Sequence, residues 1–460
     1  MTKPSTRRDG PLRAGAVVLA LLVVAGVALA GCRGSQGDVK EFEVVAAPTR
    51  LPLVDGREID VWAYNGQVPG PTLRVRLGDT LRVRFTNRLP QSTTVHWHGV
   101  RVPNAMDGVP GVTQPPIEPG ESFVYEFEPK DAGTYWFHPH IRSSEQVERG
   151  LFGVLIVDDA EPTPYPRDEL WVLDDLLLGR DGQIAPEFNT RHDLAHDGRW
   201  GNAVVVNGKR LPELHVAPGE RLRLRLLNVA NGRVFLPDFA PLETKIIAVD
   251  GRATAEPIDG ARFELAPGNR IDLDVVVPAS LAGKRITVRD RFTRRPIDLA
   301  EIVVSGEPVE TPGFAAPVAP LLADVASVPT EPPPLELRLN ARSGGPFGIE
   351  WTINGKAMSH AGGHHAADER YELRLNEPRR LRFVNDSYRL HPMHLHGMFF
   401  QLVSRNGGAV YEPFTRDTVL VHPKESVEVV AIPADPGLWM AHCHVLEHAE
   451  AGMMTLIDVR

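Results

Sequence analysis

Short runs in which apolar and polar residues alternate dominate the chain beyond residue 37. Residues 73–77 (Leu-Arg-Val-Arg-Leu), 81–85 (Leu-Arg-Val-Arg-Phe) and 222–227 (Leu-Arg-Leu-Arg-Leu-Leu) repeat with a period of two, as in strands with one buried face. Asn-Gly, Asp-Gly and Pro-Gly turns separate the runs, and 41 glycines and 41 prolines are spread along the chain. No long stretch has the spacing of an amphipathic helix. The pattern predicts an all-β protein of sandwich type.

One sequence frame occurs three times. Residues 84–87 (Arg-Phe-Thr-Asn) and 382–385 (Arg-Phe-Val-Asn) are each followed, nine residues after the asparagine, by a His-x-His-Gly motif. Residues 225–228 (Arg-Leu-Leu-Asn) have the same frame, but Pro237 and Phe239 take the places of the two histidines. We therefore expect the middle copy to keep the strands and to carry no ligands.

The repeat divides the chain into three domains, because 460 residues exceed what one ordinary core accommodates. We place them at residues 38–160, 161–305 and 335–460. Residues 306–334 contain eight prolines, and such a linker is extended and semi-rigid. It could cross the second domain and place the third against the first.

The first 31 residues have the composition of an export signal. Arg7 and Arg8 precede an uncharged, largely apolar run over residues 14–31, which ends in Leu-Ala-Gly before Cys32. This ending resembles the lipoprotein box of bacterial lipoproteins, in which the cysteine is lipidated; an uncleaved membrane anchor is the alternative. Both readings place the body outside the cytoplasmic membrane. We expect a location in the cell envelope, with a lipid on Cys32 as the membrane contact. The arginine pair matches the twin-arginine export signal only in part.

Charge and cysteine content restrict the function further. The 50 Lys and Arg against 59 Asp and Glu give a net charge of −9, which provides no electrostatic surface for nucleic acid. Cys32 and Cys443 are the only cysteines, and Cys32 belongs to the signal, so Cys443 has no disulfide partner. A free thiol in an oxidising compartment is vulnerable unless a metal occupies it.

Residues 442–453 hold three histidines, a cysteine and a methionine. A thiolate with imidazoles and a distant thioether is the ligand set of a blue copper site. Successive side chains of a strand point to opposite faces, so Cys443 would face one way and His442 and His444 the other. One strand could therefore contact two metal centres, with electrons entering at the cysteine.

Ten of the 17 histidines lie in four tight motifs. A His-x-His pair on a strand puts both imidazoles on one face, so two such strands from each of two domains would present eight imidazoles to one interface. Such a cluster suits several copper ions. The motifs are His96-x-His98, His138-x-His140, His391-x-x-His394-x-His396 and His442-Cys443-His444-x-x-x-His448.

On these motifs the chain resembles the three-domain multicopper oxidases, the family of laccases, ascorbate oxidase, bilirubin oxidase and bacterial cuprous oxidases. The resemblance covers everything after the signal. It implies three consecutive cupredoxin-like Greek-key β-sandwich domains and four copper ions. By this resemblance, the type 1 copper is bound by His391, Cys443, His448 and the axial Met453, the type 2 copper by His96 and His394, and the type 3 pair by His98, His138, His140, His396, His442 and His444.

The resemblance also implies a reaction. A reductant would give single electrons to the type 1 copper, Cys443 would pass them to its two neighbouring histidines, and the trinuclear cluster would reduce dioxygen to water. Asp107 and Glu447 resemble acids that supply protons in this family. The alternatives are a turn aspartate before Gly108 and a solvated glutamate. Each ligating imidazole is expected to use its other nitrogen for a hydrogen bond.

The reducing substrate is the open part of this interpretation. An axial Met453 lowers the potential of the type 1 copper, which leaves phenols, aromatic amines and cuprous ion accessible. We favour laccase-like oxidation of phenols or aromatic amines, with a cuprous-ion oxidase for copper tolerance as the alternative. The segment with Met358, His360, His364 and His365 is either a copper-capture loop or a solvated loop. A copper nitrite reductase or a non-catalytic copper store would not need the complete ligand set.

Overall fold

The repeated frame folds into three pairs of β-sheets, one pair for each copy. The structure is a computed structural model that describes residues 37–160, 165–260, 263–314, 316–320, 322, 324, 325, 327–358 and 370–460. The expected signal peptide, Cys32 and the histidines at 360, 364 and 365 lie outside the described residues. Most of the regular structure is β-strand, which confirms the all-β prediction.

The N-terminal pair has the strand orders β2-β1-β4-β6 and β3-β8-β7-β5. A short 3-10 helix, η1, and a helix, α1, lie between its strands. Their bounds are β1 Val39–Leu53, β2 Arg57–Tyr64, β3 Thr72–Arg76, β4 Thr80–Asn87, β5 His96–His98, η1 Asn104–Met106, β6 Ser122–Phe127, β7 Gly133–His138, α1 Ser143–Glu148 and β8 Gly153–Asp158.

The middle pair has the orders β10-β9-β12-β16-β14-β15 and β11-β18-β17-β13. Its elements are β9 Asp168–Leu176, α2 Arg191–Ala195, β10 Ala203–Val206, β11 Glu213–Val216, β12 Arg221–Asn228, β13 Pro237–Asp238, β14 Glu243–Val249, β15 Arg252–Asp259, β16 Arg270–Val276, η3 Ala279–Leu281, β17 Arg285–Asp290 and β18 Ile297–Val304.

The C-terminal pair has the orders β20-β19-β22-β27-β24-β25 and β21-β29-β28-β23-β26. Its elements are β19 Leu335–Ser343, β20 Ile349–Ile353, β21 Arg370–Leu373, β22 Arg379–Asn385, β23 His391–Leu395, β24 Phe399–Arg405, β25 Gly408–Ala409, β26 Thr418–Val421, β27 Ser426–Ile432, β28 Gly437–Cys443, α3 Leu446–Glu450 and β29 Met454–Val459.

The three asparagines of the repeated frame explain why the copies fold alike. Asn87, Asn228 and Asn385 end β4, β12 and β22 and are buried. Each side chain accepts the backbone N–H two residues later and donates to a carbonyl four or five residues later, at 2.7–3.0 Å. Each also bonds a distant carbonyl. The asparagine thus satisfies the backbone of the turn that leads to the second sheet.

The strand orders place the histidine motifs at matching positions. β5 and β23 carry His96-x-His98 and His394, and each pairs with the strand that carries the later histidine motif of its copy, β7 or β28. β13 takes the corresponding place in the middle pair, but it consists of Pro237 and Asp238. The middle copy therefore keeps the frame without the histidines, as the repeat predicted.

Each pair of sheets lies within one of the predicted domain ranges, although the exact boundaries remain predictions. The buried apolar residues of the first and third pairs form one continuous cluster, which includes Trp97 and Trp439, whereas the middle pair has a cluster of its own. The core therefore joins the two histidine-bearing copies directly.

The described residues of 306–334 connect the middle and C-terminal pairs without joining a strand. Their backbone is held at both ends: Val309 N–H donates to Pro218 at 2.8 Å, and Arg380 donates to the Val325 carbonyl at 2.9 Å. These two bonds anchor the described part of the tract to the middle and C-terminal pairs, and its role as a semi-rigid linker stays a prediction.

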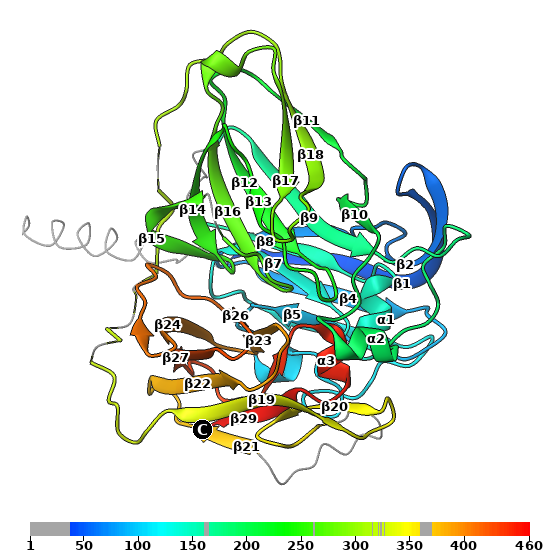
Figure 1. Cartoon of the computed structure of the whole chain (residues 1–460), viewed down its shortest axis with the longest axis vertical. Helices are drawn as coiled ribbons and strands as arrows, with labels where there is room; N and C mark the ends of the chain where they lie inside the picture. Colours follow the sequence, from blue (N-terminus) through cyan, green and yellow to red (C-terminus); the bar gives the residue numbers. More distant parts are fainter. Residues whose placement is uncertain are drawn as a thin grey trace, which may run out of the picture. The chain divides into compact units, whose positions relative to one another are not determined.

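Three short helices, one from each pair of sheets, lie side by side: α1 and α2 both contact α3 (Figure 1). α2 also packs on β20. These helices bring the middle copy against the C-terminal histidine motif. Within the part of the chain that the structure describes, no helix has the length and apolar character needed to cross a membrane.

The contact between the N-terminal and middle pairs gives a testable prediction. Gly133 begins β7 with φ 154°, and a methyl group there would overlap the carbonyl of Gly251 in the turn between β14 and β15. We expect Gly133→Ala to lower the free energy of unfolding by about 2 kcal/mol or more, because the two backbones must separate. Equilibrium urea unfolding measures this.

Gly120→Ala is the matched control. Gly120 also has a positive φ of 88°, but no atom lies within 4 Å of the added methyl group. Gly120→Ala should lower the free energy of unfolding only by the cost of backbone strain, about 1 kcal/mol. Equal losses in the two variants would contradict the close approach.

Candidate copper centres

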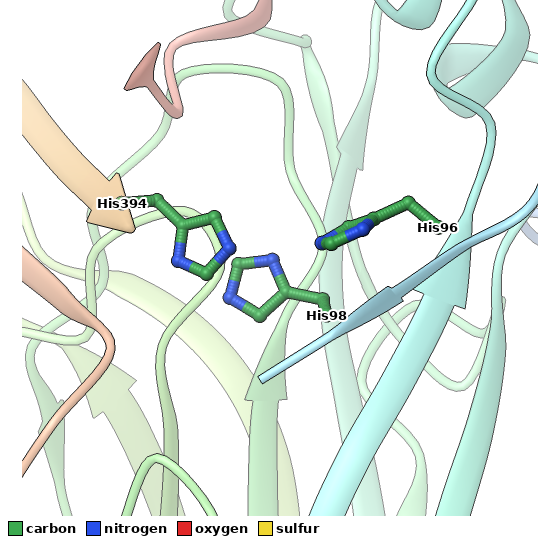
Figure 2. Close-up of side chains that lie close together, drawn as sticks. All are labelled: His96, His98 and His394. Atoms are coloured by element: carbon green, nitrogen blue, oxygen red, sulfur yellow. The ribbon is translucent and has the colours of Figure 1, made fainter. Parts of the chain in front are cut away.

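The eight predicted cluster imidazoles meet where β5 and β7 face β23 and β28. His96 pairs with His138 across one antiparallel ladder, and His394 pairs with His442 across the other. All eight residues are buried. Figure 2 shows three of them: the rings of His98 and His394 lie face to face, with centroids 3.8 Å apart, and His96 lies beside them. Two distant pairs of strands therefore build one cluster.

The cluster divides into three groups whose ligand atoms lie within 4.8 Å of one another. The resemblance gave the six type 3 histidines as one set, and the structure separates them into two sets of three. The groups are His98 with His138 and His444, His140 with His396 and His442, and His96 with His394 and His98.

The nitrogens that point into the cluster test whether a metal fits there. The buried Nε2 atoms of His96, His138 and His394 and the Nδ1 atom of His98 have no hydrogen-bond partner. A buried polar atom left unsatisfied costs about 1–3 kcal/mol, so four converging ones require an occupant. Imidazole lone pairs gathered in this way fit copper.

The opposite nitrogens are hydrogen-bonded, as expected for ligating imidazoles. His96 Nδ1 bonds the Asp107 carbonyl at 2.8 Å, and His138 Nδ1 bonds the Pro139 carbonyl at 3.0 Å. His442 Nδ1 bonds the carbonyl of Cys443 at 2.9 Å. These bonds fix each ring and direct its second nitrogen into the cluster.

Burial keeps these imidazoles neutral. It is the main cause that lowers the pKa values of His98, His138, His396 and His444 well below the ordinary value, and neighbouring imidazoles lower them further. A neutral imidazole is the form that binds a metal, so these histidines can bind metal ions without first losing protons.

A fourth group lies on the other face of β28. Cys443 Sγ is 3.5 Å from His391 Nδ1 and 3.8 Å from His448 Nδ1, and these two nitrogens are 3.2 Å apart. Met453 is fully buried beside them, and its carbonyl accepts the Cys443 N–H at 3.0 Å. Cys443 and its neighbours thus belong to different groups, as the strand period predicted.

The thiol of Cys443 is protonated without a metal, because burial raises its pKa. The outer nitrogens of the two histidines in this group are both bonded: His391 Nε2 to Ser387 Oγ at 2.8 Å, and His448 Nε2 to the His196 carbonyl at 2.8 Å. A soft, buried Cys-His-His site of this kind fits copper.

Comparisons with known proteins agree with this geometry. Multicopper oxidase family models match residues 47–162, 182–284 and 330–460. The chain belongs to the multicopper oxidase family. Its cofactor is therefore copper, and it is a copper oxidoreductase with cupredoxin-like domains that uses dioxygen and a reducing substrate.

Three similar proteins illustrate the match. Multicopper oxidase MmcO of Mycobacterium tuberculosis is 30% identical, covering 89% of this chain and 85% of its own. The crystal structure of a multicopper oxidase from Pseudomonas thermotolerans has a TM-score of 0.81 and 33% identity, covering 92% of this chain and 100% of its own. A Campylobacter jejuni multicopper oxidase described as a metallo-oxidase has a TM-score of 0.77 and 26% identity, covering 93% of each chain.

Asp107 lies directly behind two cluster histidines. Its carboxylate is 3.2 Å from His96 Nδ1 and 2.9 Å from His396 Nδ1, so it contacts one histidine assigned to type 2 and one assigned to type 3 copper. It is buried, and the following Gly108 has φ 83°. Asp107 therefore lies in a turn and also contacts the cluster; its role as a proton donor stays a prediction.

Glu447 lies elsewhere. It is fully buried on α3, which excludes the solvated alternative, and its Oε1 accepts Asn231 Nδ2 of the middle pair at 2.7 Å. Burial raises its pKa to about 7. Its partner is thus a residue of the middle copy, and a role in proton transfer stays a prediction.

Sequence reasoning missed Asp417, which holds two cluster histidines. Its Oδ1 is 3.1 Å from His98 Nε2, and its carbonyl is 2.9 Å from His394 Nδ1. Burial alone would raise its pKa, but Arg270 and His394 lower that pKa to about 2. Asp417 immediately precedes β26, and no motif spacing pointed to it.

Arg270 of the middle pair was missed as well. Its guanidinium is fully buried and donates to both Asp417 oxygens, at 2.7 and 3.1 Å. It also donates to the carbonyls of Gly268 and Thr134. A methyl group on Gly268 would lie 2.9 Å from the His98 ring and 3.0 Å from the His444 ring. The ligand-free middle copy therefore closes one side of the cluster.

We predict that Arg270→Lys folds but binds copper more weakly at the position assigned to type 2. Lysine keeps the charge and loses the planar fork that fixes Asp417. The copper affinity there should fall by about 10-fold or more. Electron paramagnetic resonance and metal analysis measure this, with the blue absorption retained.

Arg225→Lys is the control, because Arg225 is a buried arginine that bonds Asp168 in the same sheet. A full type 2 signal in Arg270→Lys, or an equal loss in Arg225→Lys, would contradict the positioning role.

We also predict that Asp107→Asn slows dioxygen reduction by about 10²-fold or more while copper stays bound, because the amide cannot deliver a proton. The measurement is the rate at which the reduced protein regains its blue colour in oxygen. Asp131→Asn is the control: Asp131 bonds Arg101 at 2.7 Å, away from the histidines. Wild-type reoxidation in Asp107→Asn would rule out the proton role.

Proposed function

We propose that this oxidase takes its electrons from cuprous ion and couples four such oxidations to the reduction of dioxygen to two waters. The observation that carries the choice of substrate is the closed imidazole edge of the Cys443 site. His391 and His448 are both fully buried, and their outer nitrogens are bonded to Ser387 and to the His196 carbonyl.

The closed edge distinguishes the two substrate classes. A phenol or aromatic amine that gives its electron by direct contact would have to reach the outer nitrogen of a ligand imidazole, and both outer nitrogens are already hydrogen-bonded within the protein. A metal ion can instead bind at the surface and pass an electron through the covering residues. The geometry therefore favours the cuprous ion over the phenol that the sequence placed first. The similarity to a protein described as a metallo-oxidase supports the same choice.

Within this proposal, copper is held by the eleven histidine and cysteine residues of the four motifs together with Met453, and it supplies one-electron storage and the chemistry of dioxygen reduction. Cys443 connects the entry site to the cluster, because its two sequence neighbours belong to the cluster groups. Asp107 contacts His96 and His396 and is the candidate proton donor. Asp417 and Arg270 keep the imidazoles in place.

A phenol or aromatic amine is the second candidate, because an apolar cavity of about 370 Å³ lies near the Cys443 site. Phe347, Ile349, Met358 and Ala451 are among its lining residues. Trp351 connects the cavity to the site: its backbone N–H donates to the Ala451 carbonyl, and its ring centroid lies 4.1 Å from that of His448. An aromatic donor held there would be separated from the imidazole by one residue.

The proposed location is the cell envelope, on the basis of the export signal and the lipoprotein-type ending at Cys32. An oxidase of cuprous ion at that location would protect the cell from copper.

The test compares oxygen uptake with cuprous ion and with 2,6-dimethoxyphenol for the wild type and Cys443→Ser. We expect kcat/KM for cuprous ion to exceed that for the phenol by about 10-fold or more, since a difference of 1.4 kcal/mol gives one factor of ten. Cys443→Ser should lose the blue colour and both activities while its circular dichroism is unchanged.

A wild type that prefers the phenol would overturn the substrate assignment. A Cys443→Ser variant that still reduces oxygen would overturn the electron route.

A further inference from the structure

We propose that His192 and His196 form a surface site for a cuprous ion, from which one electron passes to the copper at Cys443. The inference rests on the proposed function and adds a binding site to it. Both histidines belong to the middle copy, outside the four motifs, and both are exposed.

His192 lies in the short helix α2, and His196 directly follows Ala195, the last residue of that helix. The two side chains still lie next to each other: their ring centroids are 4.1 Å apart, with 37° between the ring planes. Thr190 and Asp193 begin the helix with a reciprocal pair of hydrogen bonds, at 3.0 and 3.2 Å. This capping box fixes the turn that carries the histidines.

The ring of His196 is oriented for binding. Its Nδ1 donates to the His192 carbonyl at 2.8 Å, which leaves the lone pair on Nε2. A soft, singly charged cuprous ion is satisfied by few ligands, and imidazole is among those it accepts. The adjacent imidazoles of His192 and His196 supply such a pair.

The backbone of His196 connects this pair to the buried copper site. Its carbonyl accepts a hydrogen bond from His448 Nε2 at 2.8 Å. A metal held by the His196 side chain is therefore one residue and one hydrogen bond from a ligand of the Cys443 site.

Two further bonds hold the helix end on the C-terminal copy. The Leu194 carbonyl accepts the indole N–H of Trp351 at 2.9 Å, and Asp197 Oδ1 accepts the Leu390 N–H at 2.8 Å. Trp351 itself packs against His448. The distance between the surface pair and the copper site is therefore fixed by contacts on both sides.

The redox step balances with the established acceptor. One cuprous ion becomes cupric and gives one electron to the oxidised copper at Cys443. Four such ions supply the four electrons that, with four protons, convert one dioxygen to two waters. No additional oxidant or reductant is required.

The test measures binding separately from turnover. Silver(I) has the charge and ligand preference of cuprous ion and does not donate an electron here, so it is the probe for the oxidised, copper-loaded enzyme. By isothermal titration calorimetry, the wild type should bind one more Ag⁺ than the double variant His192→Gln, His196→Gln. Glutamine keeps the backbone carbonyl that contacts His448, so the blue absorption should be unchanged.

The same variant should raise the KM for cuprous ion by about 10-fold or more, since removal of both ligands takes away the differential binding energy of the site. His215→Gln is the matched control: His215 is an exposed histidine of the middle copy beside Glu213. It should keep the wild-type silver stoichiometry and KM.

Equal silver stoichiometry in the wild type and the double variant would overturn the site, and so would an unchanged KM for cuprous ion. These failures differ from failure of the proposed function. A wild type that prefers the phenol but loses one Ag⁺ on double substitution would refute the substrate and retain the metal site. A wild type that prefers cuprous ion, with the same silver stoichiometry in the double variant, would retain the substrate and refute the metal site.

Discussion

The ion pair between Arg270 and Asp417 joins all three copies of the repeat at the histidine cluster. Burying two charges is expensive, and the arrangement is stable only when every donor finds an acceptor. Here the guanidinium bonds both carboxylate oxygens and two backbone carbonyls, and the carboxylate in turn bonds His98. The geometry of the cluster therefore depends on a residue from the copy that has no histidine motif.

This dependence gives the middle copy a physical purpose. At the cluster it supplies Arg270 and the close approach of Gly268 to two imidazole rings. At the Cys443 site it supplies His196, the residue after α2, whose carbonyl bonds the outer nitrogen of His448. A copy without a histidine motif thus contacts both the histidine cluster and the Cys443 site.

The acids show how far sequence reasoning reached. Asp107 lies against two cluster histidines, and its environment agrees with a role there. Glu447 is buried as well, but it bonds Asn231 of the middle copy, which no local pattern indicated. Asp417 makes the same kind of contact as Asp107 and was missed, because an aspartate before a strand is common and its partners are distant in sequence. The hydrogen bonds that cover the outer nitrogens of His391 and His448 were missed for the same reason, since they too join residues that no motif connects.

The sequence by itself determined the all-β fold, the threefold frame, the copper chemistry and the separation of Cys443 from its neighbouring histidines. These follow from local rules: a period of two assigns faces, and ligand type selects the metal. Only the tertiary structure decided how the eight imidazoles divide into groups, which atoms orient them, and what covers the type 1 site. Those features depend on contacts between distant segments, such as the 252 residues that separate His196 from His448. The residues that orient and cover the imidazoles, such as Asp417 and Arg270, belong to no motif, and their roles arise from packing in the folded protein.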